Sequence, residues 1–244
     1  MKIPSVLPVW DGTRQQAITL QHELAQRVER EDRLGTVRYI AGVDVSTNST
    51  TGQARAAIVI VSFPELHEVE VARAELPLTM DYIPGLLSFR ETPVILRALA
   101  TIHQAPDLLM VDGQGIAHPR RCGIASHLGV LLDMPAIGCA KSILRGKHAP
   151  LPDVVGARAD LVDRGEVIGV ALRSRRHANP LYISLGNRVR LGTAVAYVEQ
   201  CLRGYRLPEP TRLAHLRTGT LGLPTPVTTT AMEQSQLWEV DFPS

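Results

Sequence analysis

VRYIAGVDVS (37–46) is the first of three strand-like stretches, and ARAAIVIVS (54–62) and HEVEVARAEL (67–76) follow it. Short polar or proline-containing turns separate the three, which is typical of an antiparallel meander. Further along the chain, strands and helices alternate. A meander that leads into this alternation predicts an α/β fold with a mixed sheet, in which an antiparallel meander is followed by parallel strands and helices flank the sheet.

The elements around the meander are predicted from apolar spacing and from turn residues. Residues 13–30 carry apolar side chains at helical intervals, which indicates an amphipathic N-terminal helix. A helix is expected over 89–103, with Pro93 in its first turn. The remaining predicted elements are a strand over 107–113, a helix over 124–133, a strand over 135–142, a hairpin of 167–174 with 180–186, and a helix over 193–205.

Length and composition fit a globular intracellular protein. The 244 residues are 45% hydrophobic and 20% charged. We find no run of about 18 apolar residues, so a membrane partner is not expected. The N-terminus lacks the long apolar segment of a signal peptide. The three cysteines, Cys122, Cys139 and Cys201, form no CxxC pair, which favours reduced thiols and a cytoplasmic location.

Charge is distributed unevenly along the chain. Residues 1–112 contain 10 Lys and Arg against 14 Asp and Glu, whereas residues 113–244 contain 16 against 10. The basic part includes the clusters HPRR (118–121), RGKH (145–148) and RSRRH (173–177). A solvated surface would explain these clusters, and so would a face that binds the phosphates of a nucleic acid.

Two acids stand where a core is expected. Asp44 interrupts the first strand, and Asp112 ends the strand that begins at residue 107. Burying a carboxylate between valines is costly unless it is paired or bound to a metal. Either acid alone could lie at a sheet edge. If the first and fourth strands are neighbours, the two carboxylates meet, and a hard divalent cation would remove their repulsion.

Other segments add candidate functional residues. Glu91 ends the stretch DYIPGLLSFRE (81–91) and lies near the start of the helix expected over 89–103. An acid at this position could have no role beyond a favourable interaction with the helix dipole. His215 falls on a predicted late helix, and Lys141 follows a strand directly; either could be an ordinary surface residue. In the loop VDGQGIAHPRR (111–121), two glycines allow the backbone to approach a flat ligand or a phosphate.

These motifs together resemble a known family. YIAGVDVS, DYIPGLLSFRE, LLMVDGQGIAHPRRCGIASHLGV, IGCAKS and RLPEPTRLAH are similar, in that order, to the motifs of endonuclease V. The resemblance covers roughly residues 37–217 and implies a ribonuclease H-like fold. It implies one endonuclease V-like catalytic domain over residues 1–217. The Thr- and Pro-rich segment 218–244, which has no Lys or Arg, is expected to be a poorly ordered tail on which Leu237 and Trp238 could dock back.

The resemblance also implies an activity. Such enzymes use Mg²⁺ to nick nucleic acid that contains a deaminated base, chiefly deoxyinosine. They cut the second phosphodiester bond 3′ of the lesion and leave 3′-hydroxyl and 5′-phosphate ends, and Mn²⁺ is an expected substitute for Mg²⁺. The implied partner is DNA with deaminated bases, or inosine in RNA, and the protein is expected to act as a monomer.

Individual residues take roles from the same resemblance. Asp44 and Asp112 match the principal metal ligands, and Glu91 and His215 match the other members of the catalytic set. Lys141 matches a lysine that contacts phosphate. Tyr82 and Ile83 stand in the wedge turn, where Asp81 replaces the first proline of the family pattern. The walls of the base pocket are expected at Gly85, Leu87, Gly113 and His118.

The expected mechanism is metal-assisted hydrolysis of a phosphodiester, without a covalent protein nucleophile. Three points stay open from the sequence: one metal ion or two, DNA or RNA preference, and the effect of Asp81 on the wedge turn. Two rival functions also stay open. One is a ribonuclease H-like nuclease that recognises nucleic-acid structure rather than inosine. The other is a module that binds nucleic acid without cutting it.

Overall fold

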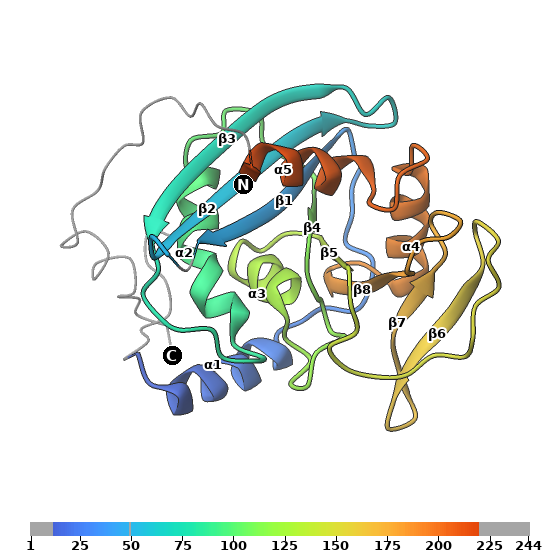
Figure 1. The fold of residues 1–244 in the computed structure, drawn as a ribbon, viewed down its shortest axis with the longest axis horizontal. Coiled ribbons are helices and arrows are strands. Elements are labelled where there is room, and N and C mark those ends of the chain that lie inside the picture. Colours follow the sequence, from blue (N-terminus) through green and yellow to red (C-terminus); the bar gives the residue numbers. More distant parts are fainter. Residues whose placement is uncertain (1–11, 49, 220–244) are drawn as a thin grey trace.

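The computed structural model describes residues 12–48 and 50–219, and it places eight strands in one mixed sheet (Figure 1). The strand order across the sheet is β3-β2-β1-β4-β5-β8-β7-β6. The strands are β1 (Tyr39–Asn48), β2 (Gln53–Ser62), β3 (Glu68–Pro77), β4 (Leu108–Val111), β5 (Ala136–Ala140), β6 (Arg158–Asp163), β7 (Glu166–Leu172) and β8 (Leu181–Asn187).

The predicted meander and the parallel strands after it are confirmed. β1 pairs with β2, and β2 with β3, in antiparallel register, while β4 and β5 add to β1 in parallel. The hairpin of β7 and β8 is also antiparallel, as expected. β1, β4 and β5 form the centre of the sheet and read as apolar runs because both of their faces are covered. The class is the expected ribonuclease H-like α/β fold.

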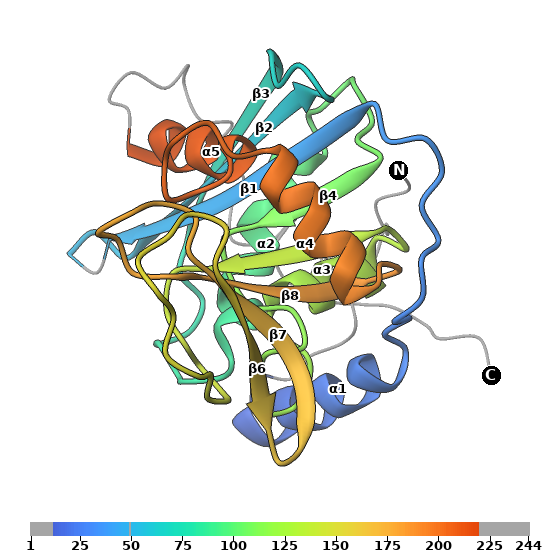
Figure 2. The same ribbon diagram turned by 90° about the vertical axis from the view of Figure 1, so that its right-hand side faces the viewer.

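Helices cover both faces of the sheet (Figures 1 and 2). On one face, α2 (Leu87–Leu99) and α3 (Ile124–Leu131) bury a core against β1, β2 and β4. On the other, α4 (Leu191–Gln200) and α5 (Glu209–Gly219) close a second core over the central strands. α1 (Arg14–Gln26) packs beside α2 and α3. Among the described residues, no helix has the length and apolar character that a membrane crossing requires.

Three details differ from the expectations. Helix α2 begins at Leu87, so Pro93 lies in its interior and not in the first turn. Strand β6 was missed because it alternates exposed and buried residues at the edge of the sheet, where its charged positions resemble a loop. Helix α5 continues through Thr218 and Gly219, two residues past the expected start of the tail. The rest of that tail, with Leu237 and Trp238, lies outside the described residues.

Candidate active site

Two strand acids meet at the centre of the sheet, where β1 and β4 lie side by side. Val43 pairs in parallel with Val111, and the backbone N–H of Asp112 donates to the carbonyl oxygen of Val43 at 2.9 Å. Asp44 and Asp112 directly follow this pair. Asp44 is 6% exposed, so its charge sits largely out of water. The predicted adjacency of the first and fourth strands is confirmed, and it brings the two carboxylates together.

Helix α5 completes the cluster because it packs directly on β1. A Cβ atom at Gly42 would lie 1.9 Å from the carbonyl oxygen of Pro210, so only glycine allows this approach. The close packing places His215 Nδ1 3.1 Å from Asp44 Oδ2. The hydroxyl of Thr218 donates to the same carboxylate oxygen at 3.1 Å.

Lys141 binds the second acid from the end of β5. Its Nζ lies 2.5 Å from Asp112 Oδ2 and 3.5 Å from His215 Nδ1. Burial, followed by the charge of Asp44, raises the pKa of Asp112 to about 6, and the Lys141 ammonium acts in the opposite direction. The net rise means that burial and the charge of Asp44 together outweigh the stabilisation that Lys141 gives to the ionised carboxylate of Asp112.

A third carboxyl group lies near these two acids. Glu91 on α2 is 8% exposed. Burial and then the charge of Asp44 raise the pKa of Glu91 to about 8; Asp112 adds to the rise, and Arg90 opposes it. Glu91 does not belong to the tightest group of potential ligands among the described residues, and with this pKa its carboxyl is mostly protonated at pH 7.

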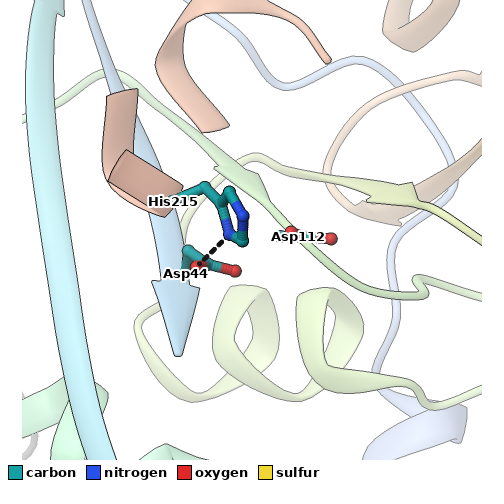
Figure 3. Close-up of side chains that lie close together, drawn as sticks. All are labelled: Asp44, Asp112 and His215. Atoms are coloured by element: carbon teal, nitrogen blue, oxygen red, sulfur yellow. Dashed lines mark hydrogen bonds and ion pairs between the residues drawn. The ribbon is translucent and has the colours of Figure 1, made fainter. Parts of the chain in front are cut away.

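The chemistry of this cluster suits a divalent cation. One potential ligand atom from each of Asp44, Asp112 and His215 lies within 4.8 Å of the other two (Figure 3). Carboxylate oxygens are preferred ligands of hard cations, and an imidazole nitrogen can join them. Burial, and then the charge of Asp44, raises the pKa values of Asp112 and Glu91, and a bound cation would favour their ionised forms. The donor set therefore fits a divalent metal ion.

A family model described as Endonuclease V matches residues 22–216, which span most of the chain. The chain belongs to the endonuclease V family. It is 50% identical over 212 residues to endonuclease V of Dehalococcoides mccartyi, covering 87% of this chain and 95% of that protein. Endonuclease V of Streptomyces avermitilis has a similar crystal structure, with a TM-score of 0.80 and 35% identity, covering 87% of this chain and 96% of that one.

Another solved relative contains nucleic acid. A variant of Ciona intestinalis endonuclease V was crystallised with a 23mer DNA that contains an inosine followed by a ribo-adenosine. That structure has a TM-score of 0.75 to this chain and 28% identity, and the match covers 86% of this chain and 97% of that one.

A pocket of about 230 Å³ opens beside the acid cluster of this endonuclease V. Pockets for drug-sized ligands span roughly 300–1,000 Å³, so this one suits a smaller group. Asp112 lines it and also belongs to the cluster of potential ligands, and Lys141, which pairs with Asp112, lines it as well. The four residues expected as pocket walls all line it: Gly85, Leu87, Gly113 and His118.

Two buried atoms of uncharged polar side chains that line this pocket have no hydrogen-bond partner within the described structure. They are the hydroxyl oxygen of Ser88 and Oε1 of Gln114. The amide nitrogen of Gln114 is occupied, since it donates to the carbonyl oxygen of Ser142 at 2.8 Å. Buried polar atoms are normally paired, so Ser88 and Gln114 are candidates to bind a polar ligand. Sequence reasoning did not select either residue.

The turn beside the pocket separates the two expected wedge residues. The N–H of Leu86 donates to the carbonyl oxygen of Ile83 at 2.9 Å, and Gly85 has a φ of +81°, which is typical of glycine at the third position of a type II turn. Tyr82 is 59% exposed and lines the pocket. Ile83 instead packs against the apolar cluster around Phe89. Tyr82 is therefore the exposed member of the pair.

His118 is fixed by hydrogen bonds on both ring nitrogens. Nε2 lies 3.0 Å from the carbonyl oxygen of Gly85, and the backbone N–H of Arg120 donates to Nδ1 at 3.2 Å. A carbonyl oxygen can only accept, so Nε2 must carry the proton. Burial, with the positive charge of Arg120 second, lowers the pKa of His118 to about 4. His118 is therefore a neutral wall of the pocket at physiological pH.

The three cysteines are buried residues without a catalytic role. All three thiols are free and buried, and burial raises the pKa of Cys122 and of Cys201 to about 12, which disfavours a nucleophilic thiolate.

The two glycines of the loop 111–121 differ in role. Gly113 lines the pocket, whereas a Cβ at Gly115 would lie 2.0 Å from the carbonyl oxygen of Leu185. Gly115 thus serves packing within the protein and not the approach of a ligand.

Proposed function

We propose that this protein is a Mg²⁺-dependent endonuclease that recognises a deaminated base, chiefly deoxyinosine, and nicks the second phosphodiester bond 3′ of it. One observation carries the proposal: Asp112 belongs both to the cluster of Asp44, Asp112 and His215 and to the wall of the adjoining pocket, and its ion-pair partner Lys141 lines the same pocket. A pocket for one extruded base beside a hydrolytic site is the arrangement that a lesion-directed nuclease needs. The inosine-containing DNA in the Ciona structure supports the same substrate class.

Asp44, Asp112 and His215 would hold the ion, with Mn²⁺ as the expected substitute for Mg²⁺. When bound, the ion supplies Lewis-acid charge at the scissile phosphate. Lys141, at 2.5 Å from Asp112, brings a positive charge to the same place and is proposed to contact a phosphate oxygen. Thr218 fixes the carboxylate of Asp44 through its hydroxyl, so that oxygen keeps one orientation. Glu91 completes the catalytic set from α2.

The pocket walls and the wedge turn would handle the lesion. Gly85, Leu87, Gly113 and His118 enclose the extruded base, and the polar atoms of Ser88 and Gln114 are available to its edge. Extrusion from a duplex costs a few kcal/mol. An inserted aromatic ring offsets part of that cost, and Tyr82 is exposed beside the pocket.

The proposed enzyme works as a single chain. Every residue of the site comes from one copy of the protein, so the proposal requires no second subunit. The three free thiols agree with a reducing compartment, and we infer the cytoplasm.

Matched oligonucleotides test the proposal. A duplex with one deoxyinosine, the same duplex with deoxyguanosine, and an RNA with one inosine are incubated with the protein in Mg²⁺ and in EDTA. We expect one nick in the deoxyinosine strand, 3′ of the lesion, with 5′-phosphate and 3′-hydroxyl ends, and none in EDTA. Equal cutting of both duplexes would contradict lesion recognition and favour a structure-specific nuclease. Binding without any cutting would favour a non-catalytic module, and preferential cutting of the RNA would replace the DNA substrate.

A further inference from the structure

One backbone carbonyl beside the pocket accepts three hydrogen bonds. The carbonyl oxygen of Gly85 lies 2.9 Å from Nε2 of Gln21, 3.0 Å from Nε2 of His118 and 2.7 Å from Nη2 of Arg120. A carbonyl oxygen has two lone pairs, so three donors occupy it fully. This oxygen is therefore used to hold the turn in place, and it is not available to a base in the pocket.

Gln21 is the member of this arrangement that comes from α1. It lies between Ala17 and Leu24 on the buried face of the helix and is 0% exposed. A buried amide on an apolar helix face is costly unless its polar atoms are paired. Both ends of this amide are paired: Nε2 also donates to the carbonyl oxygen of Cys122 at 3.0 Å, and Oε1 accepts from Nε of Arg120 at 2.5 Å.

These bonds connect three distant segments at the pocket. Gln21 is 64 residues from Gly85 and 101 from Cys122 in the sequence. Gly85 is the glycine of the turn between Tyr82 and α2, and a Cβ there would lie 2.9 Å from Nη2 of Arg120. The amide of Gln21 thus fixes the segment that carries the exposed tyrosine on one side and the pocket wall on the other.

We propose that Gln21, acting with Arg120 through the Gly85 carbonyl, is a positioning residue that keeps the pocket and the wedge turn in the shape that receives the base. The proposal rests on the function proposed above. A preformed turn spares the complex the cost of ordering it when DNA binds, so Gln21 contributes to affinity and to discrimination between bases. Gln21 lines the pocket but is not in the acid cluster, so turnover at saturation depends little on it.

Gln21→Leu is the test variant, because leucine keeps the volume and removes the hydrogen bonds. Gln15→Leu is its matched control, since Gln15 lies on the exposed face of the same helix. For Gln21→Leu we expect the half-saturating concentration of the deoxyinosine duplex to rise about tenfold, because the turn that the three lost hydrogen bonds held must then be ordered when DNA binds. Preference over the undamaged duplex should fall, and turnover at saturation should stay close to that of the unsubstituted protein.

Gln21→Glu separates two explanations. Glutamate keeps a partner for Arg120 but points oxygens, not N–H groups, at the carbonyls of Gly85 and Cys122. We expect it to be as impaired as Gln21→Leu. If Gln21→Glu behaves like the unsubstituted protein, donation from the Gln21 amide to the carbonyl oxygen of Gly85 is not required, and the proposal is overturned.

Hydrogen exchange of the Leu86 amide gives a readout that is independent of activity. This N–H closes the turn, so it should exchange faster in Gln21→Leu than in Gln15→Leu. Unchanged exchange would overturn the proposal, whatever the activity measurements give. An absence of preference for deoxyinosine in the unsubstituted protein would contradict the proposed function instead, so the two failures can be told apart. If Gln21→Leu does not fold, Arg120→Met, at a half-buried site, is measured in the same way with the same expected results and the same contradicting ones.

Discussion

At the scale of single residues, an aspartate within an apolar strand indicated where this site lies. Asp44 and Asp112 stand out in the sequence because nothing in an apolar strand compensates a buried charge. The structure places the compensation around them in the form of His215, Thr218 and Lys141. Burial, followed by the charge of Asp44, still raises the pKa values of Asp112 and Glu91. A bound cation would favour the ionised carboxylates, which makes a cation site the natural interpretation.

Tyr82→Ala tests the proposed wedge. An aromatic ring that stacks on an exposed base contributes roughly 1–3 kcal/mol, so affinity for a deoxyinosine duplex should fall by about 5- to 150-fold. Single-stranded inosine substrate should be affected much less, because no stack has to be opened. Tyr82→Phe is the control and should behave normally, since a ring is required and a hydroxyl is not. Equal losses on duplex and single strand would contradict the wedge.

His127 gives a prediction for stability against pH. It is buried on α3 against the ring of Phe89, and burial lowers its pKa to about 4. As the pH falls, His127 is protonated in the unfolded chain first, because its pKa there is near 6.5. The stability that the neutral, buried imidazole contributes is therefore present above pH 6.5 and is lost as the pH falls toward 4. Relative to His127→Leu, the unsubstituted protein should lose about 2 kcal/mol of unfolding free energy between pH 7 and pH 5. Denaturant titrations at both pH values that gave parallel changes would contradict this.

The residues that sequence reasoning missed share one property. Thr218 and Gln21 are ordinary residues for the end of a helix and for an amphipathic helix, and nothing local marks them. Their partners Asp44 and Gly85 lie 174 and 64 residues away. Acids in strands were predictable because their cost is local, whereas uncharged polar residues acquire a role only from tertiary contacts.

At the scale of elements, the position of α5 on β1 decides whether the site exists. The strands of the meander were predictable from apolar runs and turns, and their register then determined where Asp44 and Asp112 meet. The contact of α5 with β1 was not predictable, because it depends on the missing side chain of Gly42 and on the Pro210 backbone above it. Edge strand β6 was also missed, because its exposed charged residues alternate with buried ones and so resemble a loop in the sequence.

Gly42→Ala should separate α5 from β1. The new methyl group would lie 1.9 Å from the Pro210 carbonyl oxygen, so the helix must shift and His215 must move away from Asp44. We expect a loss of about 1–3 kcal/mol in unfolding free energy and a larger relative loss in nicking rate. Gly35→Ala is the matched control, because a Cβ there meets nothing within 4 Å. A folded Gly42→Ala protein with normal turnover would contradict the role given to this contact.

At the scale of the whole molecule, the number of basic residues in the sequence overestimates the positive charge that is free to bind phosphates. The later part of the chain carries 16 basic against 10 acidic residues, as a phosphate-binding face requires. The structure shows that part of this charge is used internally. Arg121 and Arg145 both pair with Asp163, and Arg173 lies near Asp153. Fewer phosphates are therefore expected to be neutralised than a count of basic residues suggests.

Salt dependence measures how many phosphates are neutralised. Affinity for DNA should fall linearly on a log–log plot against salt, with a slope of about −0.9 for each phosphate contacted. The slopes for deoxyinosine and undamaged duplexes should be similar, because the pocket reads the lesion and charge does not. Affinity that is independent of salt would contradict a basic binding face, and a much steeper slope for one duplex would contradict this division of roles.

The nicking rate of Asp112→Asn on a deoxyinosine duplex tests the central claim most directly, because Asp112 belongs to both the acid cluster and the pocket wall. Asparagine keeps the size of the side chain and removes its charge, so folding and DNA binding should persist. Under single-turnover conditions with Mg²⁺, we predict a rate at least about 100-fold lower than that of the unsubstituted protein, as expected when a group that stabilises the transition state by charge is removed. A folded Asp112→Asn protein that nicks deoxyinosine DNA at the normal rate in Mg²⁺ would contradict the claim.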